Sequence, residues 1–85
     1  MEIYLVEAEY TDKLRGTVLT THCGWSTDYE AAKKRCHEVV EEDRGEGEFP
    51  EDFEGGWNEK YEDQFCYEDE MTKILIAVYT IDQIE

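Results

Sequence analysis

The sequence TKILIAVYTI, at residues 72–81, is the most apolar stretch of the chain and decides its fold. A near-continuous run of Ile, Leu and Val of this length is typical of a β-strand that is covered on both faces, which places it at the centre of a sheet. One helix covers only one face. We therefore expect either the aromatic-rich part of the chain or a second copy of the protein to cover the other.

The N-terminal part of the chain predicts a β-hairpin. Residues 2–10 alternate in polarity as a strand does, and residues 17–23 are rich in β-branched side chains. The segment between them, at residues 11–16, has the composition of a turn and ends on a glycine.

A helix is predicted at about residues 28–43. Thr27 can serve as its N-cap with Glu30 completing a capping box, and Asp28 lies in the first turn, where the helix dipole favours negative charge. Apolar residues recur at steps of three and four and form one stripe: Tyr29, Ala32, Cys36, Val39 and Val40. Gly45 is the expected terminator.

Residues 44–60 hold four of the six glycines and the only proline, so we expect an irregular segment whose aromatic side chains hold it against the sheet. Pro50 can open a short helical turn at about residues 50–54. Residues 61–67 then alternate with a period of two, which predicts a strand, with a short helix as the alternative.

These elements give the order β-β-α-(β)-β. The expected fold is α+β, with a small antiparallel-rich β-sheet and one main α-helix packed on one face. The 85 residues form a single domain, residues 1–85, with a thin core.

The charge balance excludes several classes of partner. The chain has 23 acidic and eight basic residues, a net charge of −15. Such a charge opposes direct binding to nucleic acid or to an anionic membrane and favours a cationic partner. The three cysteines form no close pair in the sequence, and there is no leader or long apolar run, so we expect a protein of the reducing cytoplasm.

Most of the charge lies in one region. Residues 41–70 contain 14 acidic and two basic residues, a net charge of −12, and six of the eleven aromatic residues. Disordered acidic tails are normally poor in aromatic residues, which indicates that this acidic, aromatic-rich loop region, at about residues 44–70, is folded. Glu41, Glu42 and Asp43 end the predicted helix where its dipole disfavours negative charge, so we expect them to serve something other than helix stability.

The sequence gives little support for a metal site or an enzyme. Its cysteines and histidines lack the spacing of structural zinc ligands, because neighbouring ligands on a strand or helix point apart; they are His22, Cys23, Cys36, His37 and Cys66. Residues 42–54 lack the order of an EF-hand loop, although a divalent-metal-binding module stays an alternative. No motif for nucleophilic, phosphate or dinucleotide chemistry is present. We expect no cofactor and no enzymatic activity.

The acidic residues of the region favour DNA mimicry. Duplex DNA carries one phosphate charge per about 1.7 Å of its axis, and proteins that bind DNA meet those charges with Lys and Arg. Arg pairs with carboxylates much as it does with phosphate, and Trp and Tyr are common interface anchors. The candidate contact residues are Glu51, Asp52, Glu54, Trp57, Glu59, Tyr61, Glu62, Asp63, Glu68, Asp69 and Glu70, with Tyr67 as a further aromatic anchor.

Part of this region resembles a known family. The residues that carry the resemblance are Gly56, Trp57, Asn58, Tyr61, Glu62, Asp63 and Met71, and they resemble a segment of the small type II-A anti-CRISPR proteins that mimic PAM DNA. The resemblance covers residues 56–71. It implies a phage-encoded inhibitor that fills the basic cleft of a CRISPR effector nuclease. Glu62 and Asp63 would then be contacting acids, and Trp57 and Asn58 would shape a turn.

The leading hypothesis is a phage-type inhibitor that acts as an acidic DNA mimic in the cytoplasm of the infected host cell. Its partner would be a basic nucleic-acid-binding protein such as a CRISPR effector nuclease. The alternative is a small structural phage protein that forms a homodimer through a bare sheet face, with an acidic surface that serves only solubility.

Overall fold

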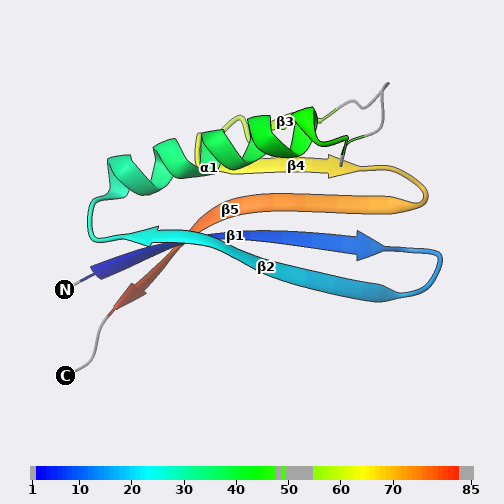
Figure 1. Ribbon diagram of the computed structural model, residues 1–85, viewed down its shortest axis with the longest axis horizontal. Coiled ribbons are helices and arrows are strands. Elements are labelled where there is room, and N and C mark those ends of the chain that lie inside the picture. Colours follow the sequence, from blue (N-terminus) through cyan, green and yellow to red (C-terminus); the bar gives the residue numbers. More distant parts are fainter. Residues whose placement is uncertain (1, 48, 50–54, 83–85) are drawn as a thin grey trace.

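A computed structural model of the protein describes residues 2–47, 49 and 55–82, which form an α+β fold (Figure 1). The elements are, in order, β1 (Glu2–Asp12), β2 (Thr17–Ser26), α1 (Tyr29–Gly45), β3 (Gly56–Trp57), β4 (Gln64–Glu68) and β5 (Thr72–Asp82). The strands form one antiparallel sheet and the helix packs on it, as the sequence predicts. No helix in the described part of the chain is long and apolar enough to cross a membrane.

Strand β5 is the middle strand of the sheet, as its apolar sequence predicts. The order of the strands is β2-β1-β5-β4-β3. Strand β5 pairs with β1 along its whole length, from Asp82 opposite Glu2 to Thr72 opposite Asp12. The first and last strands of the fold therefore lie side by side, and the two hairpins extend the sheet on either side of them.

Within the described part of the chain, only one face of the sheet is covered. Ile76 of β5 is fully buried on the side of α1, whereas Tyr79 and Ile81, which point to the other side, are 43% and 47% exposed. The expectation that the aromatic-rich segment covers this second face is wrong for the described residues, because Phe49 and Trp57 join the core on the helix side. A second copy of the protein as the cover stays a prediction.

The core lies between α1 and the sheet. Four of the five residues of the predicted helical stripe are buried, and the fifth, Tyr29, is 36% exposed. The residues of the core cluster are Val6, Ala8, Ala32, Cys36, Val39, Val40, Phe49, Phe65, Tyr67, Ile74, Ile76 and Val78. They alternate along each strand and recur at helical spacing in α1, so one apolar face of each element meets the others.

Both ends of α1 differ by a residue or two from the prediction. Asp28, and not Thr27, is the N-cap, and its Oδ1 accepts a hydrogen bond from the backbone N–H of Glu30 at 3.3 Å. Gly45 lies inside the helix. Gly47, with a φ of +81°, takes the left-handed conformation just after the helix end.

The predicted N-terminal hairpin is confirmed, and both strands are longer than predicted. The Oδ1 atom of Asp12 accepts hydrogen bonds from the backbone N–H groups of Leu14 and Arg15, at 3.0 and 3.2 Å. Gly16 completes the turn with a φ of +69°, which a residue with a Cβ adopts only at a cost.

The second half of the fold was predicted in part. The strand expected at residues 61–67 exists as β4, with Phe65 and Tyr67 facing the core, so the alternative of a short helix is wrong. Strand β3 has no counterpart among the predicted elements, because two residues are too few to show a pattern. The short helix expected at 50–54 lies outside the described residues.

Shortening a core valine should destabilise the protein, whereas the same change on the surface should not. Val6→Ala removes two methyl groups from a fully buried site. We expect this substitution to lower the free energy of unfolding by about 2 kcal/mol. Val18→Ala is the matched control, since Val18 is also on a strand of the hairpin but 59% exposed. Urea unfolding followed by circular dichroism measures both, and equal losses would contradict the assigned core.

Candidate functional site

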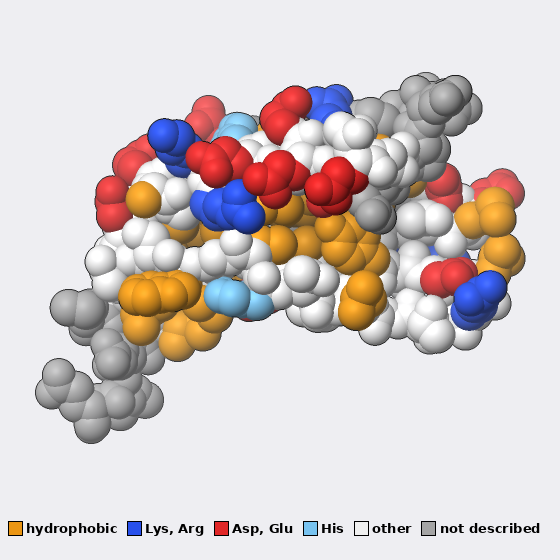
Figure 2. All heavy atoms as spheres, in the orientation of Figure 1, with side chains coloured by type: hydrophobic (Ala, Val, Ile, Leu, Met, Phe, Trp, Pro, Cys, Tyr) orange, Lys and Arg blue, Asp and Glu red, His pale blue; other side chains and the backbone are white. Residues whose placement is uncertain are grey.

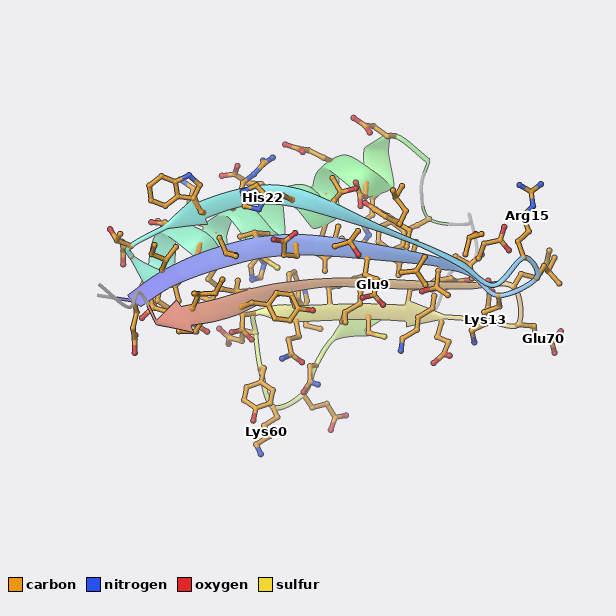
Figure 3. All side chains as sticks on the ribbon, turned by 90° about the horizontal axis from the view of Figure 1, so that it is seen from below. Glu9, Lys13, Arg15, His22, Lys60 and Glu70 are labelled. Carbon is orange, nitrogen blue, oxygen red and sulfur yellow. The ribbon has the colours of Figure 1, made fainter. Side chains whose placement is uncertain are left out.

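The predicted contact residues that the structure describes fall into two groups, one at each end of β4. The first group is Trp57, Glu59, Tyr61, Glu62 and Asp63, and the second is Glu68, Asp69 and Glu70. A strand of this length spans about 17 Å. Lys60 and Glu70, which belong to the two connections of β4, lie far apart in Figure 3. The predicted residues therefore do not form one continuous surface, and Glu51, Asp52 and Glu54 lie outside the described residues.

The acids before β4 take part in the fold. The Tyr29 hydroxyl donates a hydrogen bond to Oδ2 of Asp63 at 2.9 Å, and the backbone N–H of Val78 donates to the Asp63 carbonyl at 3.1 Å. Burial, and then the hydrogen bond to Asp63, raise the pKa of Tyr29. Glu62 forms an ion pair with Lys33 at 3.5 Å. These contacts attach the connection to α1 and β5.

Asp69 shapes the turn between β4 and β5. Its Oδ1 accepts hydrogen bonds from the backbone N–H groups of Met71 and Thr72, at 2.7 and 2.6 Å, and its Oδ2 accepts one from the Tyr67 hydroxyl. The Tyr67 hydrogen bond, followed by those from the backbone, lowers the pKa of the Asp69 carboxyl. Asp69 therefore has a structural role in the turn, and this role explains the acid without any contact to a partner protein.

Of the remaining predicted acids, one is paired. Glu68 forms an ion pair with Lys13 at 2.5 Å, and this contact lowers the pKa of Glu68. Glu59 and Glu70 are exposed and form no ion pair within the described residues. They are the two predicted acids that the described fold leaves available to a partner.

Most of the predicted aromatic anchors belong to the core. The Trp57 ring stacks on His37 with centroids 3.9 Å apart and meets Phe65 edge-on at 5.3 Å. Tyr67 is 6% exposed. Tyr61 alone among the predicted anchors has a largely accessible ring, at 46% exposure. Tyr67 is therefore not a surface anchor, because its ring is part of a thin core, and Trp57 is partly buried against the same core.

The structure shows an acidic surface on α1 that the candidate residues did not include. We call it the acidic ridge, and its members are Glu38, Glu41, Glu42 and Glu46, all exposed. With a rise of 1.5 Å per residue, helical residues four apart are separated by about 6 Å along the axis. Figure 2 shows Asp and Glu side chains gathered along the helix. The unfavourable charge at the helix end was the sequence signal for this surface.

Two arginines neutralise the ridge only in part. Arg35 forms ion pairs with both Glu38 and Glu42, at 3.4 and 3.0 Å. Arg44 pairs with Glu41 at 3.2 Å. Because one guanidinium serves two carboxylates, the ridge keeps a net negative charge and lies at the helix end that is itself negative.

A hollow of about 590 Å³ lies beside the end of α1, on the helix side of the sheet. Its lining includes Tyr10, Asp12, Leu19, Asp43, Glu46 and Ile74. Asp43 is 8% exposed and accepts a hydrogen bond from the Tyr10 hydroxyl. This contact explains why an acid occupies a position near the helix end where negative charge destabilises the helix. With three carboxylates in its lining, the hollow is suited to a positively charged group.

The cysteines and histidines do not converge. His22 is exposed and pairs with Glu7 at 3.1 Å, whereas His37 stacks on an aromatic ring, and no three potential metal-binding side chains cluster anywhere among the described residues. Cys36 is buried, which, with the nearby Asp63 charge, raises its pKa to about 12. Cys66 is exposed on the face of the sheet that α1 does not cover.

Comparisons of the chain with protein-family models, with curated proteins and with solved structures found no match. The geometry itself offers carboxylates in three places: the acidic ridge, the neighbouring hollow, and the exposed Glu59 and Glu70. Carboxylates in such settings form ion pairs and bidentate hydrogen bonds with guanidinium groups.

Native-state alkylation should distinguish the three cysteines. We expect iodoacetamide to modify Cys66 rapidly at pH 8, because Cys66 is exposed. We expect it not to modify Cys36, because that thiol is buried and its raised pKa keeps it protonated at this pH. Burial also raises the pKa of Cys23. Mass spectrometry should show one rapidly added group, and none in Cys66→Ser. Rapid addition of two or three groups would contradict this arrangement.

Asp69 should make the protein sensitive to acid. Its pKa is lowered by folding, so its contribution is present above the unfolded value of about 3.9 and is lost as the pH falls through the folded pKa. We expect unfolding free energies measured in urea from pH 6 to pH 2.5 to fall more steeply below pH 4 in the native protein than in Asp69→Asn. Parallel curves would show that the turn contributes nothing to the acid response.

Proposed function

We propose that the protein is a non-enzymatic inhibitor that uses its carboxylates to bind the basic, nucleic-acid-binding surface of another protein, as a DNA mimic. The acidic ridge is the observation that carries this proposal. It combines three exposed carboxylates on α1 and a fourth on its C-cap residue, Glu46, with a helix end of the same sign. A groove that binds DNA presents Lys and Arg toward phosphates, and the same side chains can pair with carboxylates.

The sequence that follows the ridge is also acidic. Residues 38–54 contain nine acidic residues and one basic residue, Arg44, a net charge of −8 over 17 positions. Like a nucleic acid strand, this segment carries closely spaced negative charges along a single chain. In the proposed complex this part of the chain is the principal contact, in place of the acids at residues 62, 63 and 69 that hold the fold together.

The hollow beside the ridge gives the proposed surface a specific contact. A Lys or Arg side chain of the partner would enter it and meet Asp43 and Glu46, while its aliphatic part packs on Leu19 and Ile74. Long basic side chains bury their stems on apolar surface in this way. The hollow therefore favours a partner whose basic side chains protrude from its surface, rather than a partner with a flat surface.

The class of partner is drawn from the resemblance at residues 56–71. It supports a CRISPR effector nuclease as the first target to test and a phage as the source of the inhibitor. Because Tyr61 alone among the predicted aromatic anchors has a largely exposed ring, the proposed complex depends mainly on ion pairs, and its affinity falls as the ionic strength rises.

Two triple variants test the proposal at equal net charge. The ridge variant is Glu38→Gln, Glu41→Gln and Glu46→Gln, and the control variant is Glu2→Gln, Glu9→Gln and Glu30→Gln. Each removes three negative charges from positions outside the core, and the control positions lie away from every candidate contact residue. The immobilised proteins are exposed to host-cell lysate, and a type II-A CRISPR effector nuclease is measured separately by binding titration.

We expect the native protein and the control variant to retain a nucleic-acid-binding protein that duplex DNA displaces and a salt gradient elutes. The ridge variant should lose at least tenfold in affinity for that protein. Equal losses in both variants would show that net charge alone is responsible. Retained proteins that DNA does not displace would contradict mimicry.

A further inference from the structure

Strand β2 has no charged residue. Its ten residues, TVLTTHCGWS, contain none of the 31 Asp, Glu, Lys and Arg residues of the chain. It is also an edge strand, because it pairs with β1 on one side and with no other strand among the described residues on the other side. Figure 3 shows it at the margin of the sheet, with His22 on it. Edge strands normally carry charges or prolines that prevent pairing with another chain.

The free part of this edge is residues 17–22. Beyond it the register shifts at a bulge, where Val6 lies opposite Gly24 and Glu7 lies opposite His22, so Cys23 is the extra residue. The Nε atom of Arg35 donates a hydrogen bond to the Cys23 carbonyl at 2.9 Å. The bulge and this arginine close the end of β2 near the helix start, whereas residues 17–22 pair with β1 in regular register and keep a straight outer edge.

We infer that residues 17–22 pair with the same residues of a second copy of the protein, in antiparallel orientation, to form a ten-stranded sheet. A two-fold axis perpendicular to the sheet is the symmetry that places a strand antiparallel to its own copy. Under this axis both helices lie on the same side of the sheet. The centre of the free segment places the axis at Leu19 or at Thr20, each opposite its own copy.

Charge argues for a second copy as the occupant. Two proteins of net charge −15 repel each other, so they can associate only where neither brings carboxylates into contact. The free segment satisfies this condition, since Thr17, Thr20 and Thr21 are neutral and Thr–Thr pairs across antiparallel strands are favourable. A basic partner, by contrast, is attracted to the carboxylates and gains nothing from a neutral edge.

Exposed apolar side chains support the same pairing. Leu19 is 64% exposed and Val18 is 59% exposed. Opposite pairing places Leu19 directly facing its copy, or diagonal to it if the axis passes through Thr20. The dimer thus covers a side chain that the single chain leaves in water.

The interface is small, and its dependence on salt is distinctive. Six paired residues span about 20 Å, so the buried area falls below that of a standard complex and the dimer forms at high protein concentration. Salt screens the repulsion between the two acidic chains and strengthens the dimer. This response is opposite in sign to that of the proposed partner complex, so the two associations can be told apart.

The test is sedimentation equilibrium across protein concentration, at 0.05 M and 0.5 M salt, with two variants of opposite charge. We expect the native chain to approach twice the monomer mass, more readily at high salt. Leu19→Lys and Leu19→Glu should each stay monomeric, because like charges then meet across the axis. An equimolar mixture of the two variants should regain the dimer, since Lys then faces Glu. Leu14→Lys, in the turn and 71% exposed, is the control that should still dimerise.

Several outcomes would overturn the inference. If the native chain stays monomeric at millimolar concentration and high salt, self-pairing is excluded. An extended peptide of another protein would then be the remaining candidate for pairing with this edge. Dimers that persist in both Leu19 variants place the contact elsewhere, for instance on the uncovered face of the sheet. Failure of the mixed variants to associate would contradict the two-fold register. Circular dichroism of each variant verifies that the fold is intact.

Discussion

The pairing of β1 with β5 is the interaction on which the rest of the structure depends. It joins residues at least sixty positions apart, such as Asp12 and Thr72, and places β1 beside the middle strand of the sheet, β5. The β1–β2 hairpin and the β3–β4–β5 meander are local units that this pairing brings together, and α1 packs across the result. Neither half of the chain can complete the core alone. Such a non-local contact forms slowly, because a long loop must be closed first.

The excess of acids is accommodated by neutral donors as well as by cations. Three tyrosine hydroxyls donate to aspartates: Tyr10 to Asp43, Tyr29 to Asp63 and Tyr67 to Asp69. A phenol can satisfy a partly buried carboxylate while its ring contributes apolar area to the core. This pairing accounts for three aspartates at buried or half-buried positions. It also separates structural aspartates from the glutamates of the acidic ridge.

The fold could be predicted from the sequence because its signals are local and strong: an apolar run for β5, alternation for β1 and a stripe with a cap for α1. The candidate site was predicted less well. Charge density drew attention to residues 44–70, but Asp63 has a tertiary hydrogen bond that no spacing reveals, and Asp69 accepts its hydrogen bonds within its own turn. Trp57 was taken for a surface anchor because its stacking on His37 joins distant residues. The glutamates at the end of α1 carried the informative signal, an energetically unfavourable position.

The two tryptophans lie in contrasting environments. Trp25 is 65% exposed at the end of β2, whereas Trp57 is stacked on an imidazole beside Phe65. The fluorescence of an indole depends on its surroundings, so the two side chains should emit differently in the native protein. Unfolding separates the stacked pair and gives both indoles the same aqueous surroundings. The protein therefore carries an intrinsic optical reporter of its own folding, with no added label.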